Sequence, residues 1–228
     1  MYTIVQLIRV SSTREGNAVV ITDFKINIKQ QKVYDVVGTY YDIPQDLKTD
    51  RSFERIYERA KSIINPKGIY LRRDKQGLYD LDTIDGCSHV YYCMVTLGQT
   101  VTDEVDWLFA QDRFPEALII DEISNEILFD MSSQLYDTIR SSAVKDGLGL
   151  TCRLSPGDGE LPITFQKDIF EGFDKEQVNG MYIFQGCMIY PVKSMAYIYG
   201  ADSSIVSSEG EHMCSQCANL YCKRRKQS

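Results

Sequence analysis

The chain has 228 residues, 43% of them hydrophobic, and a formal net charge of −7. This length suits one compact domain, or one domain with a small appendage. The acidic balance argues against general nucleic-acid binding, and no apolar run approaches the roughly 18 residues of a membrane helix. The N-terminus lacks the pattern of a signal peptide, so we expect a cytoplasmic protein that binds neither nucleic acid nor membranes.

The N-terminal quarter is predicted to begin with strands and continue with helices. Tyr2 to Val10 and Ala18 to Ile28 are rich in β-branched residues and flank a polar turn, which favours a peripheral hairpin. Gln31 to Val37 is predicted to be a short helix. Asp50 to Asn65 is an amphipathic helix, because its apolar residues recur at three- and four-residue steps. These residues are Phe53, Ile56, Tyr57, Ala60, Ile63 and Ile64.

The middle of the chain is predicted to alternate between strands and helices. Gly68 to Arg73 and Val90 to Leu97 have the composition of strands. Thr102 begins a helix that carries Val105, Leu108 and Phe109. After Pro115 a long helix extends to about Ser142, with one apolar stripe. The stripe consists of Ile120, Ile123, Ile127, Leu128, Met131, Leu135 and Ile139.

The last third returns to short strands. Leu148 to Leu154 is predicted to be a buried strand that ends in a Pro-Gly-Asp-Gly turn. A helix follows Pro162 and would bury Ile169, Phe170 and Phe173. Met181 to Phe184 and Met195 to Tyr199 are further strands. Helices and strands mix without a regular strand–helix repeat, so the sequence predicts an α+β fold with a mixed or antiparallel sheet and several packed helices.

Arg153 stands immediately before the Pro-Gly-Asp-Gly turn. A guanidinium at this place could hold a carboxylate in a bidentate fork, while Gly157 and Gly159 would let a small ligand approach the backbone. The alternative is an ordinary surface turn with a salt-bridged arginine.

A cysteine-rich tail follows the polar stretch from Ser203 to Glu211. Cys214, Cys217 and Cys222 have the spacing of ligands to one metal ion or one cluster edge. A zinc site would need a fourth ligand such as His212, whereas an iron–sulfur cluster would need Cys187 or a cysteine of another subunit. The alternative is a frayed tail with free thiols.

Other reactive side chains are expected to be structural. Cys87, Cys93 and Cys152 lie in or beside predicted strands and are interpreted as small buried hydrophobes. His89 has no partner motif, and Lys193 is interpreted as a surface cation.

Two motifs in order carry a family resemblance: R-x-S-P-G-x-G from Arg153, and C-M-x-Y-P-x-K-S from Cys187. Together they resemble the activation domain of vitamin B12-dependent methionine synthase, and more closely the small stand-alone proteins built from it. The resemblance extends through VTLG at 95–98 and ALIIDEISNE at 117–126. It implies an N-terminal strand or hairpin extension at 1–25, an activation domain-like core at 26–202, and a linker with a cysteine-rich tail at 203–228.

The resemblance implies a site for S-adenosylmethionine. Arg153 would hold the methionyl carboxylate, and the backbone around Ser155 and Gly157 would contact the ligand. The segment 186–194 would wall the pocket, with apolar surface from Met188 and Tyr190. Two positions depart from the family pattern. Asp158 replaces the tyrosine that follows the motif glycine, and Phe129, beside Asp130, stands near the place of an acidic residue in the long helix.

The function that the resemblance implies is reductive reactivation of the cob(II)alamin form of a corrinoid-dependent methyltransferase such as methionine synthase. The cobalamin would be carried by a separate corrinoid-binding module, and a reduced protein would donate the electron. No catalytic side chain is expected, because the cobalt is the nucleophile. The alternative is an accessory module that delivers electrons through a metal or iron–sulfur site in the tail, without methyl transfer. A third interpretation is an interaction protein with a degenerate pocket.

Overall fold

The computed structural model describes residues 18–75, 81–158, 160–185 and 187–206. Its centre is a five-stranded antiparallel sheet in the order β1-β2-β3-β7-β4. The strands are β1 (Val19–Ile21), β2 (Lys67–Asp74), β3 (His89–Thr96), β7 (Ser194–Asp202) and β4 (Gly149–Leu150). The predicted α+β class is therefore confirmed.

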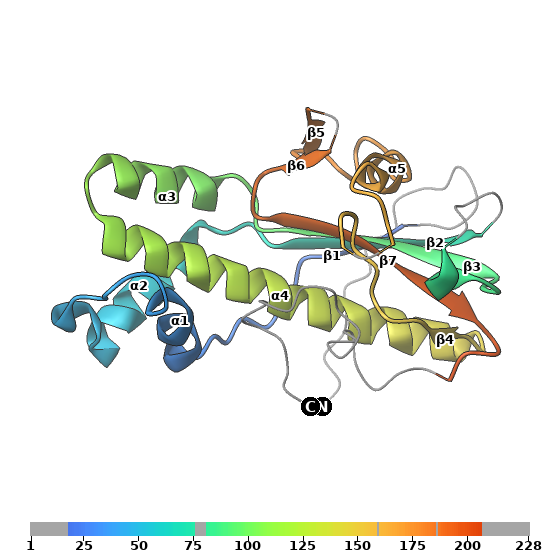
Figure 1. Ribbon diagram of the computed structural model, residues 1–228, viewed down its shortest axis with the longest axis horizontal. Coiled ribbons are helices and arrows are strands. Elements are labelled where there is room, and N and C mark those ends of the chain that lie inside the picture. The colour runs from blue at the N-terminus through green and yellow to red at the C-terminus, as the bar shows by residue number, and fades with distance from the viewer. Residues whose placement is uncertain (1–17, 76–80, 159, 186, 207–228) are drawn as a thin grey trace.

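The long helix α4 (Phe114–Lys145) crosses one face of this sheet (Figure 1). The helices α1 (Gln30–Val37), α2 (Asp50–Ile63) and α3 (Thr100–Ala110) all contact α4. The opposite face carries α5 (Phe165–Glu171) and a two-stranded hairpin, β5 (Tyr182–Phe184) with β6 (Met188–Tyr190). Two single-turn helices, Gln45–Leu47 and Asp82–Ile84, lie in the connections.

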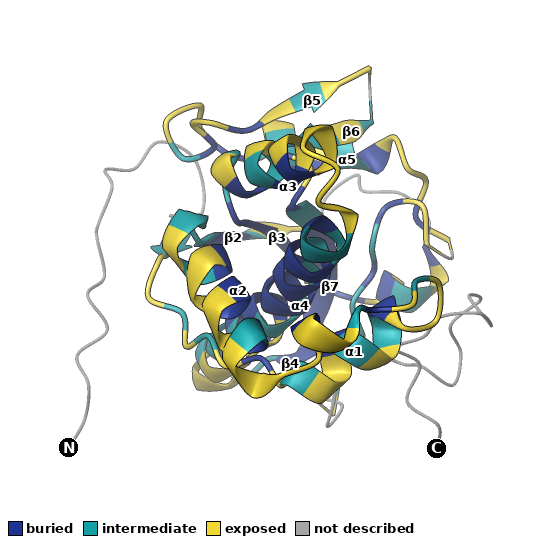
Figure 2. Ribbon diagram, turned by 90° about the vertical axis from the view of Figure 1, so that its left-hand side faces the viewer, coloured by how far each residue is buried: buried dark blue, intermediate teal, exposed yellow. Residues whose placement is uncertain are grey.

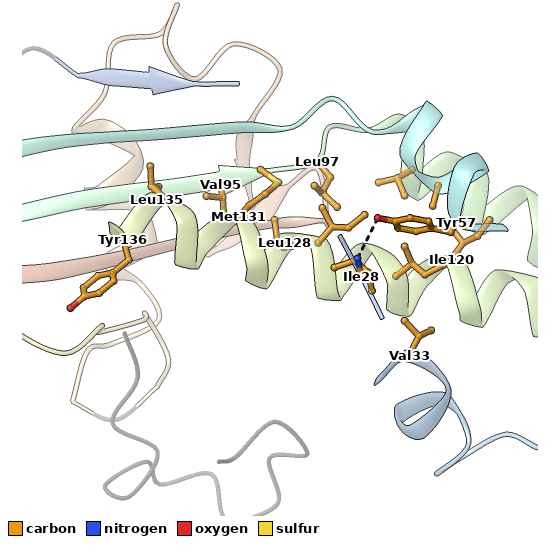
Figure 3. Close-up of a cluster of buried hydrophobic side chains, with 14 of the residues drawn as sticks. Ile28, Val33, Tyr57, Val95, Leu97, Ile120, Leu128, Met131, Leu135 and Tyr136 are labelled. Atoms are coloured by element: carbon orange, nitrogen blue, oxygen red, sulfur yellow. Dashed lines mark hydrogen bonds between the residues drawn. The ribbon is translucent and has the colours of Figure 1, made fainter. Parts of the chain in front are cut away.

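The sheet separates two hydrophobic clusters. Successive side chains of a strand point to opposite faces. In β7, Tyr197 and Tyr199 therefore pack toward α4, whereas Ala196 and Ile198 pack toward α5. Figure 3 shows the first cluster, in which the Tyr57 hydroxyl accepts a hydrogen bond from the Ile28 N–H at 3.3 Å.

The helices form where the apolar periodicity places them. In α2 the residues Phe53, Ile56, Tyr57 and Ala60 are buried, and Thr49 caps the helix by accepting from the Ser52 N–H at 3.2 Å. Figure 2 shows the result, with exposed ribbon outside and buried ribbon toward α4. None of the helices in the described part of the chain combines the length and apolar character that a bilayer-spanning segment requires.

Two predicted elements differ from the structure. The strand predicted for Leu148 to Leu154 is regular only over β4, because the Gly200 N–H bonds the Thr151 hydroxyl and the ladder resumes only at Leu154. The predicted strand from Ala18 to Ile28 is reduced to β1, and its proposed partner at residues 2–10 lies outside the described residues.

Candidate functional site

Arg153 lies on the side of the sheet that faces α4. Its Nη1 donates to the Ser132 hydroxyl at 2.8 Å, and its guanidinium lies 5.1 Å from the centroid of the Tyr197 ring. Ser132 belongs to α4 and Tyr197 to β7, and both are buried. Arg153 is only half-buried. The structure therefore places a guanidinium where α4, β7 and the turn after Leu154 meet.

The edge of β7 beside Arg153 has open backbone groups. Leu154 and Ile198 exchange two backbone hydrogen bonds, of 3.0 and 2.8 Å, on this edge. Because the N–H and C=O groups of an antiparallel strand alternate between its two sides, those of Ala196 point to the same edge. Among the described residues, no backbone group pairs with Ala196 there. Ala196 is itself only 5% exposed, so these two backbone groups lie at a buried part of the strand edge.

The turn after Leu154 has the geometry that its glycine predicts. Gly157 has a φ of +85°, and its N–H donates to the Leu161 carbonyl at 2.8 Å. The Asp158 N–H donates to the Ser155 carbonyl at 3.0 Å, and the Asp158 side chain is exposed. Ser155, Gly157 and Asp158 therefore form one tight turn that follows Arg153 directly.

Tyr190 and Met188 lie elsewhere. The Tyr190 ring contacts the Tyr182 ring, with 4.9 Å between centroids, inside the β5–β6 hairpin. This hairpin stands on the α5 side of the sheet, and Met188 is 54% exposed (Figure 1). The structure does not bring the Tyr190 ring and the Arg153 guanidinium onto one face, so a shared pocket remains a prediction.

Lys193 corrects one interpretation, because it is not a surface cation. It is only 8% exposed, and its Nζ donates to Asp121 at 2.6 Å and to Asn125 at 2.8 Å. The Asn125 amide donates in turn to Glu122 at 3.1 Å. Alternate residues of an extended segment point to the same side, so Lys193 points toward α4, as Met195 and Tyr197 do. Polar side chains of α4 bind its ammonium group there.

The helix α4 supplies partners that the sequence patterns did not single out. Ser132 stands beside Met131 on the buried stripe, and Asn125 and Asp121 lie two and three turns earlier on the same helix. In the sequence, the position of polar Ser132 next to the apolar stripe was the feature that could have indicated a buried polar contact. Near these residues, burial raises the pKa of Asp130, against a lowering by its hydrogen bond from Gln134.

Two cavities of the described structure lie away from Arg153. One, of about 660 Å³, lies between α1 and the start of α2 and is lined by Tyr34, Asp35 and Lys48 among others. A smaller one, of about 170 Å³, lies between α2, α3 and α4. Neither includes a residue that the sequence predicted to bind a ligand.

Metal-ligating side chains do not gather in the described part of the chain. No group of three or more His, Cys, Asp or Glu side chains there could hold a metal ion. Cys87 and Cys93 are buried and Cys152 is half-buried, and burial raises the pKa of Cys87 and Cys152. Cys214, Cys217, Cys222 and His212 lie outside the described residues.

Comparison with known proteins identifies a class of fold. The chain is similar to the crystal structure of the MetH reactivation domain bound to AdoHcy, with a TM-score of 0.51 and 12% sequence identity. The match covers 77% of this chain and 74% of that chain. At this identity the likeness shows the fold. No protein-family model matches the chain, and no curated protein matches it.

Proposed function

We propose that the chain binds S-adenosylmethionine and supports reductive reactivation of the cob(II)alamin form of a corrinoid-dependent methyltransferase. The observation that carries this proposal is the fold shared with the MetH reactivation domain, whose crystal structure contains AdoHcy. The described residues add a suitable arrangement, because a guanidinium and a glycine turn lie next to each other at the edge of β7.

Arg153 would hold the methionyl carboxylate of the ligand. A carboxylate accepts two parallel, charge-assisted hydrogen bonds from a guanidinium, and Nη1 of Arg153 also bonds the Ser132 hydroxyl. The Tyr197 ring supports the guanidinium from β7. The N–H and C=O of Ala196 would bind ligand groups that extend along the strand edge.

Asp158 would complete the turn side of the site. Its exposed carboxylate follows Gly157, where the resembled family has a tyrosine. A carboxylate at this place accepts hydrogen bonds from a ligand ammonium or from ribose hydroxyls. The stacking surface of the family tyrosine is absent, so contacts would depend more on charge and less on apolar packing.

The contribution of this chain would be positioning. The bound S-adenosylmethionine supplies the methyl group, and the cobalt belongs to the corrinoid module of the partner. The residues around Arg153 would hold the ligand in one orientation for transfer of its methyl group. A separate reduced protein would supply the electron.

The cysteine-rich tail is proposed to hold zinc or an iron–sulfur cluster through Cys214, Cys217 and Cys222. The residue types and the spacing support this. The electron-delivery alternative depends on this tail, and no observation on the described residues favours it.

Calorimetric titration of anaerobically purified protein with S-adenosylmethionine tests the proposed function. Saturable one-site binding, repeated with AdoHcy, is the expected result. Mixing the loaded protein with a cob(II)alamin-loaded methyltransferase and a reductant should then restore methylcobalamin, seen in the visible spectrum. Absence of ligand binding up to millimolar concentration, both alone and with the corrinoid protein present, would reject the proposal.

A further inference from the structure

The helices α2, α3 and α4, which face the viewer in Figure 2, line a partly open cavity of about 170 Å³. Its lining includes Ile56, Leu108 and Ile120, one from each helix, and each is at most 3% exposed. The cavity therefore has an apolar floor, and its volume is about that of one large side chain.

The rim of the cavity is positively charged. Arg55, Arg59 and Arg113 line it together with a single carboxylate, Glu116. Both Arg55 and Arg113 contact this carboxylate, the first at 3.3 Å. Arg59 pairs at 2.6 Å with Glu104, outside the lining. Three guanidinium groups thus face two carboxylates, which leaves one positive charge in excess on a chain whose net charge is −7.

Aromatic surface adjoins this rim. The Arg113 guanidinium lies 5.9 Å from the centroid of the Trp107 ring, and Trp107 is 47% exposed. At the tip between α3 and α4, the Phe109 and Phe114 rings contact each other and are 36% and 44% exposed. Exposed aromatic residues beside arginines are the composition that protein interfaces favour.

We propose that this arginine–tryptophan pocket, defined by Arg55, Arg59, Arg113, Trp107 and the apolar floor, binds a segment of a partner protein. The segment would carry a carboxylate next to an apolar side chain. The apolar side chain enters the cavity, and the carboxylate takes a bidentate bond from Arg113, which shares Glu116 with Arg55.

The charge balance selects this occupant. An uncharged apolar segment would add no carboxylate, so Arg55 and Arg113 would still share Glu116. A basic segment would be repelled. The cavity volume admits one side chain, so the contact is small and the complex is expected to be transient. The pocket uses none of the residues around Arg153, so it is independent of the proposed ligand site.

Trp107 provides the measurement, because it is the only tryptophan in the chain. The full chain is titrated with a blocked peptide of alternating leucine and glutamate, and tryptophan emission is followed. Saturable binding with a shift of the emission to shorter wavelength is expected as the peptide covers the ring. A peptide with lysine in place of glutamate should not bind, and salt should weaken the acidic peptide.

Two substitutions at the rim of the cavity should change the affinity for the acidic peptide in opposite directions. Arg113→Gln should weaken peptide binding about tenfold, the usual effect of losing one charged hydrogen bond. Glu116→Gln should tighten it several-fold, because both arginines lose their shared competitor. Arg140→Gln, at an exposed arginine far along the same helix, is the matched control and should change nothing. Circular dichroism verifies that each variant is folded.

Several outcomes would overturn the proposal. These are no saturable change in emission, equal binding of the lysine peptide, or an unchanged affinity of Arg113→Gln. Equal binding of octanoate would identify a site for small amphipathic acids instead of a docking site. An emission shift that depends on protein concentration alone, with dimers in sedimentation, would identify a second copy of the chain as the occupant.

Discussion

At the scale of single residues, Arg153 is the side chain on which the proposed ligand site depends most. It connects the turn with α4 through Ser132 and with β7 through Tyr197. Sequence motifs located this arginine, but they could not identify its partners. Those contacts depend on how α4 is rotated against the sheet, which is set by packing across more than one element.

Replacing Arg153 should weaken the binding of S-adenosylmethionine. We expect Arg153→Ala to lose more than about 1.5 kcal/mol, because charged hydrogen bonds contribute about that much. The affinity of Arg153→Lys should lie between those of wild type and Arg153→Ala. Lysine keeps the positive charge but cannot donate two parallel hydrogen bonds to one carboxylate. Calorimetric dissociation constants measure the effect, with Arg140→Ala as the control. An affinity of Arg153→Ala equal to wild type would remove Arg153 from the site.

Asp202 predicts a specific loss of stability in acid. Hydrogen bonds from the backbone and hydroxyl of Ser204, and from Ser88, lower the pKa of Asp202 from 3.8 to about 2. Because the folded-state pKa is the lower one, this stabilisation is present above the unfolded-state pKa. It is lost as the pH falls toward 2.

Asp202→Asn should therefore reduce stability at neutral pH and lose this difference from wild type in acid. Urea midpoints at pH 7, 4 and 2.5 measure it. Asp137→Asn, at an exposed position on α4, is the control. A deficit of Asp202→Asn that stays constant over this range would show that the carboxylate charge does not matter.

At the scale of elements, the sequence predicted the long elements well and the short ones poorly. The helix from about Pro115 to Ser142 corresponds to α4 because seven stripe residues fix its period. The strand after Gly147 has only two regularly paired residues in β4, and its backbone bonds, including those of Thr151 and Leu154, are made to the distant strand β7. Local patterns hold no information about such non-local bonds.

The connection between β6 and β7 is fastened to α4 by Lys193. Its side chain is 10% exposed and Asp121 is 38% exposed, so solvent partly screens the pair. Lys193→Met keeps the packing but leaves the carboxylate without its cation, and we expect a loss of about 1–3 kcal/mol of unfolding free energy.

A double-mutant cycle with Asp121→Asn separates the pair from the packing. Lys167→Met is the control, because Lys167 and Glu171 form an exposed pair that contributes little. Additive effects of the Lys193 and Asp121 substitutions would show that the two do not cooperate.

The turn after Leu154 offers a second prediction at this scale. Gly157 has positive φ, and an added Cβ would lie 3.0 Å from Ile163 Cδ1. Gly147 also has positive φ but no atom within 4 Å of such a Cβ. Gly147→Ala should cost about 1 kcal/mol from its backbone alone, and Gly157→Ala should cost more. Equal decreases in the denaturant midpoints of the two variants would show that the Ile163 side chain moves aside without an energetic cost.

At the scale of the whole molecule, the sequence predicts the fold more completely than the ligand site. The fold could be predicted because the amphipathic helices and the motif order agree over most of the chain. The likeness to the MetH reactivation domain confirms it. The site could be predicted only in part. Arg153 and its turn are local, whereas the position of Tyr190 depends on which face of the sheet the β5–β6 hairpin covers.

The last prediction concerns the tail and the function of the whole chain. Cys214→Ser with Cys217→Ser should abolish bound metal, measured as zinc and iron per chain after anaerobic purification, because thiolates are the ligands that both sites need. Cys93→Ser, at a buried thiol in β3, is the control and should keep the metal. Visible absorbance in the wild type would identify iron–sulfur, whereas colourless protein with one zinc would identify a structural site. Full metal content in the double variant would place the ligands elsewhere.

If S-adenosylmethionine still binds to the metal-free variant, the tail and the Arg153 site are independent, as a positioning role for the core requires.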